Sequence, residues 1–296
     1  MKHFAVFICL VLALTACNPG PEHPDREDWI SLFNGKDLTG WDIKISGHDL
    51  NENYLNTFRV ADSMMVISYA DYDTFGTNYG HIYYQEPFSH YRLRFEYRFT
   101  GNQTPGGATW NVRNSGVMVH SQPANSLFHD QDFPISLEMQ LLGGLSDGNP
   151  RTTGNLCTPG TQVDMNGAHN TMHCINSSSD TYDGDQWLKG EMLVLGDSLI
   201  QHFINGQLVL EYDHPVINET DERAIGSYLS GDWPQGKVGK PLRDGYIALQ
   251  AESHPIDFRK IELLQLKGCR NPKCPDYKSY YVVEGDCDCA AEGAVR

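Results

Sequence analysis

The sequence predicts an all-β fold, a sandwich of antiparallel sheets. Two observations support this. Short segments in which apolar and polar residues alternate follow one another from about residue 29, separated by turn residues. Segments with the period and length of a helix are few. The chain has 296 residues, 40% of them hydrophobic, so it is long enough to bury a complete core.

The clearest strand is "YRLRFEYRFT", residues 91–100, in which aromatic and aliphatic side chains alternate with charged ones. "NSGVMVH", residues 114–120, and "ISLEMQLL", residues 135–142, show the same period. Residues 191–212 predict three strands, and the last two are joined at Asn205-Gly206, a strong hairpin signal. Residues 245–266 predict two more strands, interrupted at His254-Pro255.

Two long segments separate the predicted strands, residues 141–187 and 218–245. Loops of this length inside a compact domain usually carry function or are disordered. We expect one β-sandwich domain at residues 29–267 and a small Cys-rich appendage at residues 268–296.

The first residues, "MKHFAVFICLVLALTAC", combine a basic start with an apolar run too short for a membrane span. "LTAC" resembles a bacterial lipobox. We therefore expect a lipoprotein signal peptide at residues 1–16, a lipidated Cys17, and a solvated tether at residues 17–28. The expected location is the bacterial cell envelope, with membrane contact only through the lipid anchor.

Six cysteines remain after Cys9 is removed with the signal peptide and Cys17 is lipidated. They suggest disulfides, because six is an even number and the expected compartment is oxidising. Cys157 and Cys174 enclose a long polar loop, and we expect them to pair. The other four are in the appendage, where we expect cross-links between the two close pairs, with the pairing left open: Cys269, Cys274, Cys287 and Cys289. A zinc site is the weaker alternative, because "CRNPKC" and "CDC" lack the usual ligand spacing.

The formal net charge of −16 argues against nucleic acid as a partner, since phosphate binding requires clustered basic residues. A small neutral carbohydrate is compatible with this charge.

Polar residues in the register opposite the aliphatic positions suggest a functional sheet face. They are His120, Glu138, Gln140, Gln250 and Glu252. A merely solvated sheet face is the alternative. Histidine, glutamate and glutamine are unusual on such a face, however, and these residues flank the longest loops.

Several motifs occur in the order found in one bacterial family: "LFNGKDLTGW", "NSGVMVH", "LEMQLLGG", "GDQW", "HFINGQLVLEY" and "GYIALQAESHPIDFRKIELL". Over residues 29–267 the chain thus resembles the 3-keto-disaccharide hydrolase family. The resemblance implies a concanavalin A-like jelly roll of two antiparallel sheets, with long loops around a concave substrate groove.

An ordinary glycosidase needs two carboxylates beside the scissile bond, and here the same-face partner of Glu138 on its strand is Gln140. The family's substrate suggests another reaction. A ketone at C3 acidifies the C2 proton, so that proton abstraction, elimination of the C1 substituent and hydration give net hydrolysis. We expect Glu138, His120 and His254 to be catalytic. An oxidoreductase that forms the ketone would act upstream.

A divalent metal ion bound by His173 and His120 is a further expectation, since it would polarise the ketone, and no organic cofactor is expected. For substrate binding we expect Gln140, Gln250, Glu252 and Asn114. The aromatic candidates for stacking on a sugar are Trp110, Trp187, Tyr228 and Trp233, and we favour Trp233 because its loop is polar. The alternative function is a non-catalytic carbohydrate-binding lipoprotein on the same fold.

Overall fold

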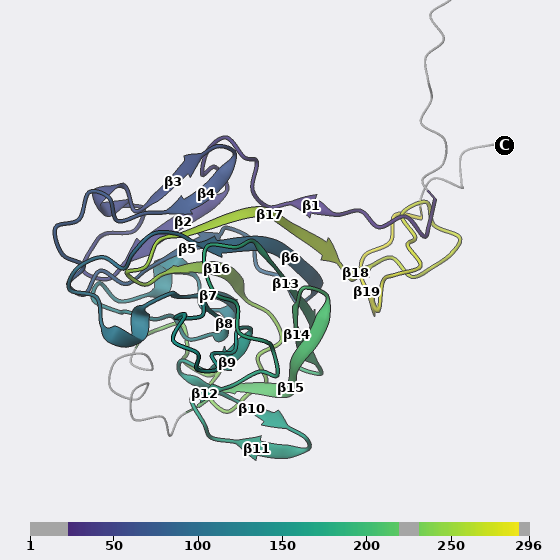
Figure 1. The fold of residues 1–296 in the computed structure, drawn as a ribbon. Coiled ribbons are helices and arrows are strands. Elements are labelled where there is room, and N and C mark those ends of the chain that lie inside the picture. Colours follow the sequence, from purple (N-terminus) through teal and green to yellow (C-terminus); the bar gives the residue numbers. More distant parts are fainter. Residues whose placement is uncertain (1–22, 219–230, 290–296) are drawn as a thin grey trace, which may run out of the picture.

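Two antiparallel sheets stacked face to face form the body of the protein in a computed structural model, which describes residues 23–218 and 231–289 (Figure 1). The larger sheet has the order β11-β10-β15-β14-β13-β6-β17-β4-β3, and β1 pairs with β17. The smaller sheet has the order β12-β9-β8-β7-β16-β5-β2. The predicted all-β jelly-roll sandwich is confirmed.

The larger sheet consists of β1 (Ile30–Ser31), β3 (Phe58–Ala61), β4 (Met64–Ile67), β6 (His90–Phe99), β10 (Thr161–Met165), β11 (Ala168–Asn170), β13 (Leu188–Leu195), β14 (Ile200–Ile204), β15 (Gln207–Ile217) and β17 (Ile256–Gln265). The smaller sheet consists of β2 (Trp41–Ile45), β5 (Gly80–Tyr84), β7 (Asn114–Ser121), β8 (Leu137–Leu142), β9 (Asn155–Cys157), β12 (Cys174–Ile175) and β16 (Tyr246–Ala251). The helical turns are η1 (Tyr54–Asn56), η2 (Thr109–Asn111) and η3 (Ala124–Ser126).

The core lies between the two sheets and follows the alternation read from the sequence. On β6 the odd-numbered residues from Tyr91 to Phe99 are buried in it. From the smaller sheet, Val117, Met139 and Leu249 are fully buried in the same core. Each such side chain contributes about 1.5–3 kcal/mol on burial. The core therefore fixes which side chains of β7, β8 and β16 face the other way.

The hairpin between β14 and β15 turns at Asn205 and Gly206, as predicted. Their φ angles are 50° and 82°. Positive φ at both central residues is what a two-residue type I′ turn requires, and Asn-Gly meets that requirement with little strain.

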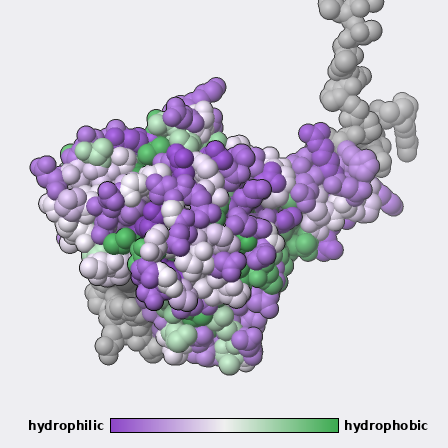
Figure 2. Space-filling model, in the orientation of Figure 1, coloured by the Kyte–Doolittle hydropathy of each residue, from purple (hydrophilic) through white to green (hydrophobic). Residues whose placement is uncertain are grey.

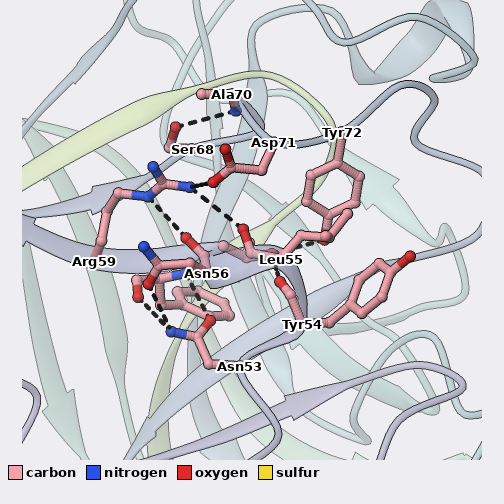
Figure 3. Close-up of polar contacts among 11 residues, drawn as sticks. Asn53, Tyr54, Leu55, Asn56, Arg59, Ser68, Ala70, Asp71 and Tyr72 are labelled. Atoms are coloured by element: carbon pink, nitrogen blue, oxygen red, sulfur yellow. Dashed lines mark hydrogen bonds and ion pairs between the residues drawn. The ribbon is translucent and has the colours of Figure 1, made fainter.

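Polar side chains hold the segment that leads into β3 (Figure 3). The Asn53 amide group bonds both the N–H and the carbonyl of Phe58, at 3.0 and 2.6 Å. Arg59 donates to the carbonyl of Asn56 at 2.7 Å and pairs with Asp71 at 3.1 Å. These contacts hold Leu55 and Asn56, whose φ angles are positive.

The appendage after β17 projects from the sandwich beside β1 (Figure 1). Its two-stranded sheet pairs β18 (Lys267–Gly268) with β19 (Val283–Glu284). Two disulfides hold it, Cys269–Cys287 and Cys274–Cys289, and thus cross-link the two close pairs as expected.

The last residues of the expected tether are largely exposed, and they also contact the appendage. Lys278 pairs with Asp28 at 2.6 Å, and Ser279 donates a backbone hydrogen bond to the carbonyl of Pro24 at 3.1 Å. The rest of the tether, Cys17 and the predicted signal peptide lie outside the described residues.

The face drawn in Figure 2 is largely hydrophilic, with hydrophobic residues in small separate patches. Among the described residues, no helix has both the length and the apolar character required to cross a membrane.

Candidate functional site

A cavity of about 460 Å³ opens on the outer face of the smaller sheet, the face turned away from the core. Side chains of β7, β8, β9 and the end of β16 supply its polar residues, and loops supply its aromatic ones. Its lining residues are Trp110, Asn114, Phe133, Glu138, Gln140, Cys157, Pro159, Gly160, His173, Cys174 and Glu252. Four predicted site residues of the sheet therefore meet in one place: Asn114, Glu138, Gln140 and Glu252.

Glu138 lies over Gly116 of the neighbouring strand. Gly116 faces Gln140 in the β7–β8 register, and a Cβ atom built on Gly116 would overlap the Glu138 carboxyl group. The glycine of "NSGVMVH" therefore makes room for this carboxyl group, which is 7% exposed. Burial raises the pKa of Glu138 to about 8.

Glu252 follows β16 and is also buried, at 3% exposure. Burial raises its pKa well above the usual value, and the neighbouring charge of Glu138 raises it further. Two carboxyl groups that oppose each other's ionisation in this way retain at least one proton at neutral pH. From the sequence Glu252 was expected among the substrate-binding residues, and its pairing with Glu138 could only be guessed, because the proximity of β8 and β16 across β7 is a tertiary feature.

The polar part of the cavity offers free acceptors. Within the described residues, Oδ1 of Asn114 and Oε2 of Glu252 are buried without a hydrogen-bond partner. Gln250 also has a buried and unpartnered Oε1 on the outer face of β16, but this predicted binding residue is not among those that line the cavity. Gln140 is already engaged, since its Oε1 accepts from Asn155 at 3.1 Å. Acceptors of this kind suit a ligand rich in hydroxyl groups.

The Cys157–Cys174 disulfide, predicted from the sequence, forms part of the cavity wall. Cys157 is directly opposite Glu138 in the β8–β9 register, and Cys174 is opposite Cys157 in the β9–β12 register. The disulfide therefore holds β12, and with it the preceding His173, against β9, which is the neighbour of the carboxyl-bearing strand β8.

Trp110, one of the four aromatic candidates although Trp233 was favoured, lines the cavity together with Phe133, which was not predicted. Trp110 is 53% exposed and belongs to η2, directly before β7. Its sequence context, "PGGATWN", is a glycine-rich turn. The same argument that favoured Trp233, an indole in a polar loop, could therefore have identified Trp110.

The prediction that His120 faces the groove is wrong. The β7–β16 register shifts between Tyr246 and Ala248, and His120 has a φ of 50°. This bulge interrupts the alternation after Val119, so the ring turns towards the larger sheet, where Nε2 donates to the carbonyl of Gly196 at 2.9 Å. His120 is fully buried, and burial lowers its pKa, which keeps the ring neutral.

His254 and Trp233 also lie away from the cavity walls. His254 lines a separate cavity of about 230 Å³ with Arg113, and burial, aided by that arginine, lowers its pKa to about 4. Trp233 packs beside the buried cluster of Ile135, Ile217 and Leu242, with the Lys237 ammonium 3.9 Å from the centre of its ring. Trp187 lies between Arg98 and Arg259 on the larger sheet, and Tyr228 is outside the described residues.

The expected metal site is not assembled. Among the described residues, His, Cys, Asp or Glu ligand atoms lie together in groups of three or more at two places, the appendage cysteines and Asp164 with Asp213 and His214. The four cysteines are consumed by disulfides. Neither group contains His120, and neither contains His173. The residues present do not fit the metal expected at the cavity.

Comparison with known proteins gives a family match. The model of the family described as "3-keto-alpha-glucoside-1,2-lyase-like domain" matches residues 28–264. No curated protein sequence matches the chain.

Solved structures of similar shape are distant in sequence. A protein from Parabacteroides distasonis, provisionally described as a glycosyl hydrolase, has 20% identity and a TM-score of 0.47 over 80% of this chain and 93% of its own. A carbohydrate-binding module from Bacillus subtilis has 10% identity and a TM-score of 0.42 over 77% and 96%. A β-glucanase from Bacillus licheniformis has 11% identity and a TM-score of 0.42, over 81% of this chain and 97% of its own. These similarities assign no activity.

Replacement of His120 is expected to cost stability. His120→Ala removes a buried ring and leaves the Gly196 carbonyl without its donor, which should lower the free energy of unfolding by about 2–4 kcal/mol. Thermal melting measures this, with His129→Ala, which removes an exposed ring, as the matched control. Equal melting temperatures for the two variants would contradict the buried hydrogen bond.

The carboxyl pair should make stability depend on pH. Burial raises the pKa of Glu138 in the folded protein from 4.5 to about 8. The contribution of this proton to the free energy of unfolding is therefore complete below about pH 4.5 and is lost as the pH rises towards 8. Between these two pH values the free energy of unfolding falls by roughly 1.4 kcal/mol per pH unit for one proton. In denaturant titrations from pH 5 to 9, the free energy of unfolding of Glu138→Gln should fall less steeply with pH than that of the wild type. Glu211→Gln, at an exposed position, should fall as steeply as the wild type. Parallel plots of unfolding free energy against pH for wild type and Glu138→Gln would refute the raised pKa of Glu138.

Proposed function

Because this chain belongs to the 3-keto-alpha-glucoside-1,2-lyase-like family, we propose that it is an enzyme that cleaves 3-keto-glycosides by elimination followed by hydration. The observation that carries the proposal is the buried carboxyl pair, Glu138 and Glu252, on the floor of the cavity. After the loss of one of its two protons, such a pair presents one base and one acid. The reaction requires both.

The roles follow from the two environments. Glu252 holds its proton more strongly, since it experiences both burial and the charge of Glu138. Glu138 therefore acts as the base and takes the C2 proton, which the adjacent C3 ketone acidifies. Glu252 acts as the acid and protonates the departing C1 oxygen. A double bond then joins C1 and C2, and addition of water across it gives the free 3-keto sugar.

The surrounding groups support binding of a sugar. The unpartnered oxygen of Asn114, which lines the cavity, provides an acceptor for hydroxyl groups beside the carboxyl pair. Such an acceptor lowers the free energy of a bound sugar, since it is buried and otherwise unsatisfied. The ketone must be formed before this reaction, so an oxidoreductase acting on the C3 hydroxyl is the proposed upstream partner.

The proposal is tested with a 3-keto-glucoside that carries a chromogenic leaving group. Turnover is expected, and it should persist after treatment with a chelator, because the carboxyl pair supplies both proton positions. In D2O the released keto sugar should carry deuterium at C2, beyond the exchange seen when the product is incubated alone. Binding without turnover would instead identify a non-catalytic carbohydrate-binding protein.

The two carboxyl groups should differ in a substrate-dependent way. Glu138→Gln preserves shape but removes proton affinity, so kcat should fall by roughly 10²-fold or more for every substrate. Glu252→Gln should reduce kcat strongly only for poor leaving groups, since a nitrophenolate departs without protonation. Steady-state kinetics on both substrate types check this, with Glu211→Gln as control. A uniform effect of both variants would overturn the assignment of roles.

We also propose that the chain is exported as a lipoprotein, anchored through Cys17 to the cell envelope. Three disulfides support an oxidising compartment. Cys17→Ala should release a soluble protein with unchanged kcat, as judged by cell fractionation and the chromogenic assay. Retention of this variant in the membrane fraction would contradict lipid anchoring.

A further inference from the structure

We propose that the aromatic wall of the cavity, defined as Trp110 and Phe133 and supported by the ring of Tyr79, binds an aromatic leaving group, so that the preferred substrates are 3-keto-glycosides of aromatic alcohols. This inference rests on the function proposed above and extends it to the substrate class. It separates the cavity into two parts, a polar floor for the keto sugar and a flat apolar wall for the group that departs.

The wall is held by its own contacts. The rings of Trp110 and Tyr79 are stacked with centroids 6.1 Å apart and planes 7° from parallel. Phe133 packs on the same tyrosine at 5.1 Å. Tyr79 is in turn supported by fully buried Phe75, edge to face at 5.1 Å, and its hydroxyl accepts from Asn111 at 3.2 Å. The aromatic wall is therefore fixed before any ligand arrives.

Trp110 is the unusual member, because a large indole remains 53% exposed at a cavity where it faces no core. The stack with Tyr79 occupies one face of the indole. An aromatic ring that stacks on the indole would remove its apolar surface from water, a gain of about 0.5–1.5 kcal/mol beyond area burial.

The chemistry of the lining favours an aromatic group over a second sugar. The polar side chains that line the cavity are Asn114, Glu138, Gln140, His173 and Glu252, all from the sheet or next to its strands. The loop residues of the lining add Trp110, Phe133, Pro159 and Gly160, whose side chains offer a single polar group, the indole N–H of Trp110. A departing sugar would carry several hydroxyl groups, and apart from one that could accept from the indole N–H they would lose water without gaining a side-chain partner there.

The test compares substrates within each variant, so that differences in leaving-group reactivity cancel. The value of kcat/KM is measured for a nitrophenyl 3-keto-glucoside and for a 3-keto-disaccharide, with wild type, Trp110→Ala, Trp110→Phe and the control Trp187→Ala. We expect Trp110→Ala to lower kcat/KM for the nitrophenyl substrate by about tenfold or more, mainly through KM, and by less than about threefold for the disaccharide. Trp110→Phe should recover most of the loss, and Trp187→Ala, on the other sheet, should change neither value.

Equal losses on both substrates, or no loss with Trp110→Ala, would overturn the inference while leaving the proposed function intact. Failure of the wild type to turn over either substrate would instead remove the proposed function. In that event calorimetry compares phenyl and methyl 3-keto-glucosides on wild type and Trp110→Ala. Tighter binding of the phenyl compound that is lost in the variant supports the aromatic wall, and equal binding of the two refutes it.

Discussion

The burial of two carboxyl groups side by side is the constraint on which the site depends. Within the described residues, neither Glu138 nor Glu252 has a cationic ion-pair partner, so their charged forms are disfavoured by lost hydration and by each other. The sandwich tolerates this because its core between the sheets is large and uninterrupted. The outer face of β7, β8 and β16 is thereby free to hold groups that weaken the fold at high pH but are suited to proton transfer.

Most of the fold could be predicted from the sequence, because the alternation of side chains is a local property. Every odd-numbered residue of β6 from Tyr91 to Phe99 is buried, as its pattern indicates. The same reasoning placed Glu138 and Gln140 on the face opposite the core. The prediction from alternation failed at His120, because one bulge opposite Ile247 changes which side of the sheet the next residue faces. No residue type in this strand predicts that bulge.

The site was harder to predict for a different reason. Which strands are neighbours decides which side chains meet, and β16 reaches β8 only across β7. The pairing of Glu138 with Glu252 therefore depends on topology rather than on spacing in the sequence. His254 is two residues beyond Glu252, yet it lines another cavity, since the strand has ended and alternation no longer applies. Loop residues such as Trp110 and Phe133 have no periodicity from which their direction can be read.

The Cys157–Cys174 disulfide has a consequence for how the protein is prepared. It lies outside the core between the sheets, so a chain produced in a reducing cytosol can still form the sandwich and give an ordinary circular dichroism spectrum. In that chain the segment with His173 would lose its covalent link to β9 and keep non-covalent contacts, among them the two-residue pairing of β12 with β9 and the hydrogen bonds from Thr158 to the His173 carbonyl. The inactivity of a soluble, well-folded recombinant sample would then be due to the missing disulfide, and it would not show that the protein lacks the activity.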